Sequence, residues 1–90
     1  MTVEARERQI LMYTTHQGRQ PFREWFDKLR DERAMQKIDT RVARVRRGNL
    51  GITRSAGEGV LELKIDYGPG YRLYVGQDGA QLIILLCGGD

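Results

Sequence analysis

The chain is poor in cysteine, histidine and long apolar runs, and each shortage excludes a class of protein. A single cysteine, Cys87, excludes an internal disulfide and fits a reducing compartment. With His16 as the only histidine, a zinc site of the usual kind is not expected. The longest apolar run, Leu82 to Cys87, is far shorter than the roughly 20 residues of a membrane span, and no secretory signal is visible. We expect a cytoplasmic protein with one domain over residues 1–90 and without membrane association, metal or cofactor.

Positive charge is concentrated in the middle of the chain. Between Arg33 and Arg54 there are seven basic residues and one acid, Asp39, although the net charge of the whole chain is only +3. Twelve of the fifteen basic residues are arginines, whose planar guanidinium suits bidentate contact with phosphate. The expected partner is therefore nucleic acid or an acidic protein, with a merely solvated surface as the alternative.

Apolar spacing predicts an α+β fold in the order β-α-α-β-β-β. The predicted elements are a strand at 9–14, a helix starting at Pro21, a helix capped by Asp31 and ending near Arg47, and strands at 60–65, 71–75 and 81–87. Residues 53–59 are small and polar, so they are predicted to form a loop. The last strand is apolar on both faces and is expected centrally in the sheet. The arrangement is a mostly antiparallel sheet with a two-helix hairpin on one face.

In the two predicted strands on either side of the turn at 68–70, alternate side chains project to opposite faces of the sheet. One face carries Glu62, Lys64, Arg72 and Tyr74. The opposite face is apolar, with Leu61, Leu63, Ile65, Tyr71, Leu73 and Val75. An amine, a guanidinium and a phenol on one face are suited to a phosphate backbone. Alternatively, Lys64 and Glu62 form a surface ion pair worth less than about 1 kcal/mol, and Tyr74 packs across strands.

Further cations gather on the second predicted helix. Arg33, Lys37, Arg41 and Arg44 fall within about 80° of one another on the helical wheel, away from the apolar stripe. Arg54 lies in the predicted loop ahead of the strands. Contacts of these residues with RNA phosphates would depend strongly on salt.

Four segments in order resemble the RelE/ParE superfamily of toxins of type II toxin–antitoxin modules, and most closely its HigB-like "addiction module killer" branch. The segments are Pro21-Phe22-Arg23-Glu24-Trp25-Phe26, Gly57-Glu58-Gly59-Val60-Leu61-Glu62-Leu63-Lys64-Ile65, Gly68-Pro69-Gly70-Tyr71-Arg72-Leu73-Tyr74 and Leu85-Leu86-Cys87-Gly88-Gly89-Asp90. The resemblance implies a RelE-like sheet and a ribosome-dependent messenger-RNA endonuclease. It also implies a cognate antitoxin, expected to be a small helix-turn-helix protein that forms a hetero-oligomer with the toxin.

The resemblance also implies a catalytic site. In RelE-type members, basic residues on the sheet stabilise the scissile phosphate while the ribose 2′-hydroxyl attacks it, without a metal. Lys64 and Arg72 match basic positions of the family, whereas Glu62 stands where RelE has a second lysine. We therefore predict Lys64, Arg72, Glu62 and Tyr74 as catalytic. Arg54, Arg41, Arg44 and Lys37 are predicted to bind RNA or the ribosome.

Two other interpretations remain open at this stage. A ParE-like protein would bind DNA gyrase and perform no chemistry, and the same fold serves both activities. The family usually has a basic residue and a short helix beyond the Gly-Gly-Asp, which the printed sequence lacks. A binding-only module is therefore the third interpretation, with an exposed flank beside Leu82–Leu86 as its association site.

Overall fold

The computed structural model describes residues 7–79 and 82–90, which fold into one sheet and two helices. In chain order the elements are β1 (Gln9–Met12), α1 (Pro21–Asp27), α2 (Glu32–Arg46), β2 (Thr53–Gly57), β3 (Val60–Ile65), β4 (Tyr71–Asp78) and β5 (Leu82–Gly89). The predicted α+β class is confirmed. The predicted start of the last strand at Gln81 lies outside the described residues. Neither described helix is long and apolar enough to cross a membrane.

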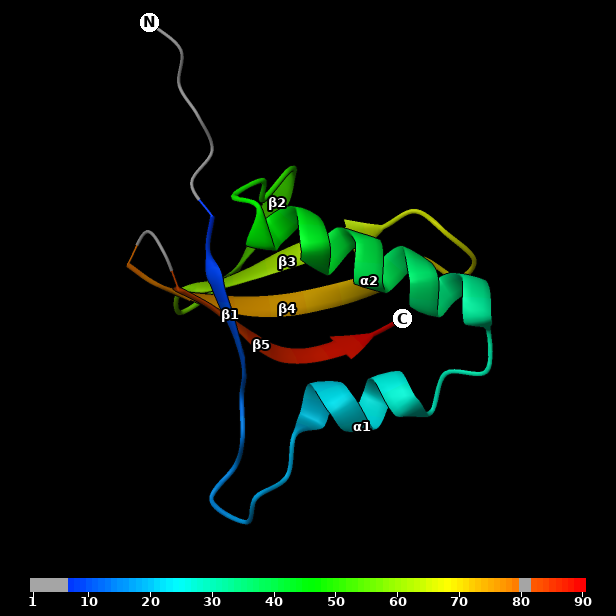
Figure 1. Cartoon of the computed structure of the whole chain (residues 1–90), viewed down its shortest axis with the longest axis horizontal. Coiled ribbons are helices and arrows are strands. Elements are labelled where there is room, and N and C mark those ends of the chain that lie inside the picture. Colours follow the sequence, from blue (N-terminus) through cyan, green and yellow to red (C-terminus); the bar gives the residue numbers. More distant parts are fainter. Residues whose placement is uncertain (1–6, 80–81) are drawn as a thin grey trace, which may run out of the picture.

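The strands form one mixed sheet in the order β1-β5-β4-β3-β2 (Figure 1). The pairs β2–β3, β3–β4 and β4–β5 are antiparallel, whereas β1 runs parallel to β5. β5 is therefore an interior strand, as its apolar sequence predicts. The prediction of an exposed flank beside Leu82–Leu86 is wrong, because β1 pairs with β5 from Gln9 opposite Leu82 to Met12 opposite Leu85.

A strand forms where a loop was predicted. Within β2, Arg54 lies opposite Glu62 of β3, and the connecting turn passes through Glu58, whose φ is +54°. The loop prediction was wrong because β2 is an edge strand whose side chains are almost all exposed, so they show no alternation of apolar and polar residues. Pairing with β3 rather than burial holds this strand in place.

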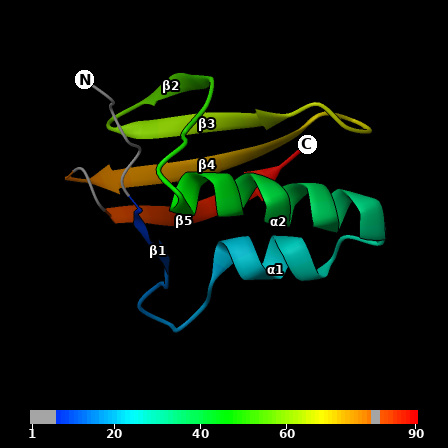
Figure 2. The ribbon, with the colours of Figure 1, turned by 45° about the horizontal axis from the view of Figure 1, so that its top comes forward.

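Both helices lie on one face of the sheet, with α1 against β5 and α2 against β3 (Figure 2). Pro21 occupies the first turn of α1, where its missing N–H costs no hydrogen bond. Asp31 caps α2 by accepting the backbone N–H groups of Arg33 and Ala34 at 3.0 and 3.2 Å. The Tyr67 hydroxyl donates to the same carboxylate at 2.9 Å and ties the start of α2 to the turn after β3. The predicted helix starts are confirmed.

The hydrophobic core lies between the helices and the inner face of the sheet. Its buried members are Phe22, Ala34, Ile38, Val45, Leu63, Ile65, Tyr71, Leu73, Val75, Ile83 and Leu85. On β5, the Trp25 ring lies so close to Gly88 that a methyl group there would overlap it, whereas no atom approaches the corresponding position of Gly89. Gly88 therefore permits the close approach of α1 to the sheet.

Candidate functional site

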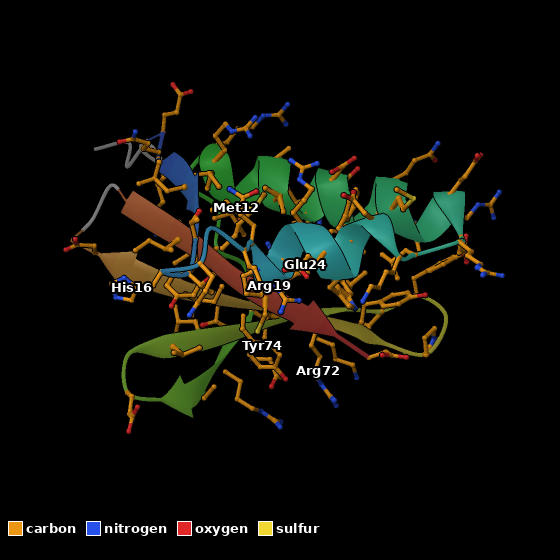
Figure 3. All side chains as sticks on the ribbon, turned by 90° about the horizontal axis from the view of Figure 1, so that it is seen from below. Met12, His16, Arg19, Glu24, Arg72 and Tyr74 are labelled. Carbon is orange, nitrogen blue, oxygen red and sulfur yellow. The ribbon has the colours of Figure 1, made fainter. Side chains whose placement is uncertain are left out.

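The face of the sheet opposite the helices carries the polar side chains that the alternation predicts. Antiparallel pairing places Lys64 opposite Arg72, and Glu62 opposite both Arg54 and Tyr74. Residues paired in this way project on the same side of a sheet, so the five side chains share the outer face. Figure 3 shows Arg72 and Tyr74 projecting on the side of the sheet away from α2.

A shallow groove on this outer face brings four of the predicted site residues together. Its volume is about 350 Å³, and its lining residues are Ile52, Thr53, Arg54, Glu62, Lys64 and Arg72. Tyr74 is half-buried beside it, through its pairing with Glu62. Ile52 and Thr53 were not predicted as site residues. No chemical signal in the sequence marks them, because Ile52 precedes and Thr53 begins the unpredicted strand β2, which brings them to the groove.

Each of the two central cations has an acidic neighbour. Arg72 Nε lies 3.3 Å from Glu62 Oε1, and Lys64 Nζ lies 3.6 Å from Asp66 Oδ1. The interpretation that Lys64 pairs with Glu62 is therefore wrong, because Arg72 on the adjacent strand reaches that carboxylate diagonally. The Lys64 and Arg72 side chains are 61% and 44% exposed, so each pair contributes no more than about 1 kcal/mol. Both cations remain accessible to a polyanion that competes with these acids.

A second hollow, also of about 350 Å³, joins the sheet to the cationic side of α2. It is lined by Lys37, Thr40, Arg41, Arg44, Lys64, Ile65 and Asp66. Three predicted RNA-binding residues of the helix thus share a surface with Lys64 of the sheet. The spacing of these helical cations places them along one side of α2, as the sequence predicts.

Arg41 also has a structural contact. One of its guanidinium nitrogens donates a hydrogen bond to the Leu50 carbonyl. A methyl group added at Gly51 would lie only 2.9 Å from the same guanidinium. Burial lowers the pKa of Arg41 from its ordinary value, and the charge of Arg44 lowers it further, but an arginine stays protonated at neutral pH. Arg41 therefore fixes the connection between α2 and β2 while it presents positive charge to the hollow.

Histidine and cysteine, the usual acid–base and nucleophilic side chains, do not line the groove. His16 is exposed in the loop after β1 and lies well away from Arg72 in Figure 3. Cys87 is half-buried opposite Tyr74, and burial raises the pKa of its thiol, which disfavours the reactive thiolate. Within residues 7–79 and 82–90 no cluster of His, Cys, Asp and Glu could hold a metal ion.

Another hollow, on the α1 side, is lined by Thr15, Gln17, Arg19, Pro21, Glu24, Trp25 and Lys28. The Arg19 guanidinium donates to both oxygens of Glu24, at 3.2 and 2.5 Å, and Figure 3 shows the two side chains together. Hydrogen bonding to Arg19 holds the pKa of Glu24 below its ordinary value. The α1 hollow is lined by two cations and one carboxylate, whereas the outer-face groove is lined by three cations and one carboxylate, so the groove is the stronger candidate for an anionic ligand.

The comparisons with known proteins give a relative for most of the chain. No family model and no solved structure matches it. A protein of Haemophilus influenzae (strain ATCC 51907 / DSM 11121 / KW20 / Rd), described as an uncharacterized protein, is 46% identical over 69 residues, which cover 77% of this chain and 70% of the relative. Identity of this extent shows common descent, and the chain belongs to the same family as the Haemophilus influenzae protein.

Proposed function

We propose that this protein is the toxin component of a type II toxin–antitoxin module of the RelE/ParE superfamily, and that it cleaves messenger RNA in the ribosome without a metal ion. The observation that carries the proposal is the outer-face groove, where Arg54, Lys64 and Arg72 line one surface with a single carboxylate, Glu62. Cations that converge on one groove stabilise the charge that develops on a phosphate during transfer. The polar outer face predicted from sequence alternation supports the same function.

The groove contains candidates for each step of cleavage by a 2′-hydroxyl. The Glu62 carboxylate removes the hydroxyl proton as the 2′-oxygen bonds to phosphorus. Arg72, whose Nε lies 3.3 Å from Glu62, donates hydrogen bonds to the non-bridging phosphate oxygens. The Lys64 ammonium gives a proton to the 5′-oxygen as the P–O5′ bond breaks. The products are a 2′,3′-cyclic phosphate and a 5′-hydroxyl, and exchange with water restores both side chains.

Tyr74 is proposed to position a base next to the scissile phosphate. Its backbone lies opposite Glu62, and the residue is half-buried on the outer face, so part of its side chain is available for stacking. Base–aromatic stacking is tolerant of sequence and contributes about 1–3 kcal/mol per base. Tyr74 would thereby hold the substrate strand across the groove while Arg72 binds its phosphate.

The proposed partners follow from the charge of the same surface. The ribosome and its messenger RNA would meet Arg54 on the sheet and the cations of α2, in the cytoplasm. The proposed antitoxin is a small helix-turn-helix protein that forms a hetero-oligomer with the toxin. A helix-turn-helix protein encoded by the adjacent open reading frame would support this assignment.

A second candidate function is binding without chemistry, as in a ParE-like gyrase inhibitor. The observation that favours it is that Lys64 and Arg72 already have carboxylate neighbours, Asp66 and Glu62. Surfaces that pair cations with acids also occur where two proteins dock with complementary charges. In that function the outer face would recognise a protein, and transcripts would remain intact.

Induction of the protein in growing cells separates the two functions. Protein synthesis, DNA synthesis and transcript integrity are followed in parallel after induction. The proposed function predicts an early stop in translation with cleaved transcripts. An early block in DNA synthesis with intact transcripts would instead support gyrase binding. Arg72→Ala should relieve the translation block, whereas the charge-matched control Arg23→Ala, on the exposed side of α1, should remain toxic.

A further inference from the structure

Three hollows of the surface are connected by residues that they share. Lys64 lines both the outer-face groove and the second hollow at α2. Lys37 and Thr40 line that second hollow and also a third, of about 410 Å³, whose lining is Arg33, Gln36, Lys37, Thr40 and Tyr67. The three hollows are therefore adjacent, and together they trace a path from the outer face of the sheet to the start of α2.

The path passes around the edge of the sheet at the position where β2 begins. β2 pairs with β3 only as far as Thr53 opposite Leu63. Lys64 and Ile65 lie beyond that last pair, so the end of β3 is paired with β4 on one side and has no strand of residues 7–79 and 82–90 on the other. A flexible polymer can pass from one face of the sheet to the other at this position, with Lys64 between the two faces.

Positive charge continues along the whole path. Cations that line it are Arg54 and Arg72 on the sheet, Lys64 at the edge, and Arg44, Arg41, Lys37 and Arg33 on the helix. The lining acids are Glu62 and Asp66. Arg33 and Arg44 are separated by about 17 Å along the helix axis at 1.5 Å per residue, which is long enough for more than one phosphate. A linear polyanion matches this shape and charge better than a compact anion.

We infer that a single RNA strand whose scissile phosphate lies in the outer-face groove continues around the end of β3 and along the cationic side of α2. This inference rests on the proposed function and names the substrate as a single strand, because a rigid duplex cannot follow such a turn. Tyr67 ends the path. Its hydroxyl donates to Asp31, so its ring is held in place as a wall for the last base.

The test measures how RNA affinity depends on strand length. Fluorescein-labelled 2′-O-methyl oligouridylates of 4 and 12 nucleotides, which cannot be cleaved, are titrated with purified protein and followed by fluorescence anisotropy. The double variant Lys37→Gln/Arg44→Gln removes two charges from the helical part of the path. The control Arg23→Gln/Lys28→Gln removes one charge from α1 and one from the residue that follows it, and α1 lies against β5.

The wild-type protein and the control should bind the 12-mer more tightly than the 4-mer. In the helix variant the 12-mer affinity should fall roughly 3- to 30-fold, so that most of the gain with length is lost. The slope of log affinity against log salt concentration should become shallower by about 1.4, since each phosphate contact with a single strand contributes about 0.7.

Other results overturn the inference and leave the proposed function to its own test. Equal affinity of wild type for the two lengths, or a helix variant that keeps the full gain, would exclude a path along α2. A helix variant that binds RNA normally and loses affinity only for an acidic protein would also exclude the RNA path, because α2 would then be a protein interface. Failure of the proposed function is distinguished by intact transcripts in the induction experiment, whatever the RNA affinity.

Discussion

On the inner face of β3 and β4, Leu63, Leu73 and Val75 are fully buried, whereas on the outer face Lys64 and Arg72 are 61% and 44% exposed. The two sets alternate along the same two strands, so one stretch of sequence encodes both the core and the candidate site. The comparison shows that the two roles are physically separable. A substitution on one face should change stability, and a substitution one residue away should change only activity.

Leu73→Ala and Arg72→Ala are neighbouring substitutions with opposite expected outcomes. Leu73 has no exposed surface, so its truncation leaves a cavity and should reduce the free energy of unfolding by about 2–5 kcal/mol. Arg72→Ala should change it by only about 1 kcal/mol, because it leaves no cavity and removes one ion pair in which Arg72 is 44% and Glu62 20% exposed. Urea denaturation measures both. Similar losses in the two variants would show that the faces are not independent.

Two adjacent glycines of β5 also lie on opposite faces of the sheet, because Gly88 pairs with Leu73 and Gly89 with Arg72. A methyl group at Gly88 would overlap the Trp25 ring on the inner face, so Gly88→Ala should destabilise by about 1–3 kcal/mol. Gly89, which lies opposite Arg72 on the outer face, has no atom near the added methyl group, so Gly89→Ala should be within about 0.5 kcal/mol of wild type. Equal stability of the two variants would mean that Trp25 does not pack on β5 as described.

The smallest expected effect concerns pH and the cap of α2. The Tyr67 hydroxyl, with the N–H groups of Ala34 and Arg33, holds the pKa of Asp31 below its ordinary value. A carboxylate with a lowered pKa contributes stability above its unfolded-state pKa, and that contribution is lost as the pH falls through the folded-state value. The melting temperature of wild type should therefore decrease more between pH 5 and pH 2 than that of Asp31→Asn, by a few degrees.

Thermal denaturation followed by circular dichroism at several pH values measures this difference. Tyr67→Phe is the matched control, since it removes one hydrogen bond and keeps the carboxylate and its two backbone donors. Its pH dependence should lie between those of wild type and Asp31→Asn. Parallel pH curves for all three proteins would contradict the proposed role of Asp31.

Much of the fold follows from the sequence because its signals are local. The apolar spacing of α2 and its cap at Asp31 predict that helix, and the alternation in β3 and β4 predicts which side chains are buried. β2 could not be predicted, because its exposed residues such as Arg54 and Ser55 carry no pattern and depend on pairing with β3. Such pairing is a long-range effect that local propensity does not report.

The candidate site was predictable in its residue types but not in its contacts. Alternation indicates that Glu62, Lys64 and Arg72 share a face. The ion-pair partner of each charged side chain depends on strand register and twist. In the structure Arg72 pairs with Glu62, and Lys64 pairs with Asp66. The connection of Lys64 to the helical cations requires that β2 begins only at Thr53, opposite Leu63, so it could be found only in three dimensions.

In the proposed function, the outer face of β3 and β4 cleaves RNA through attack by the ribose 2′-hydroxyl. The most direct test is a single-turnover cleavage assay with purified protein, ribosomes programmed with a labelled transcript, and the same transcript carrying a 2′-deoxy residue at the cleaved position. We predict a 2′,3′-cyclic phosphate product, no cleavage at the deoxy position, and a roughly 100- to 1,000-fold slower reaction for folded Arg72→Ala. Cleavage of the deoxy substrate would exclude attack by the 2′-hydroxyl, and a wild-type rate for Arg72→Ala would exclude a catalytic role of Arg72.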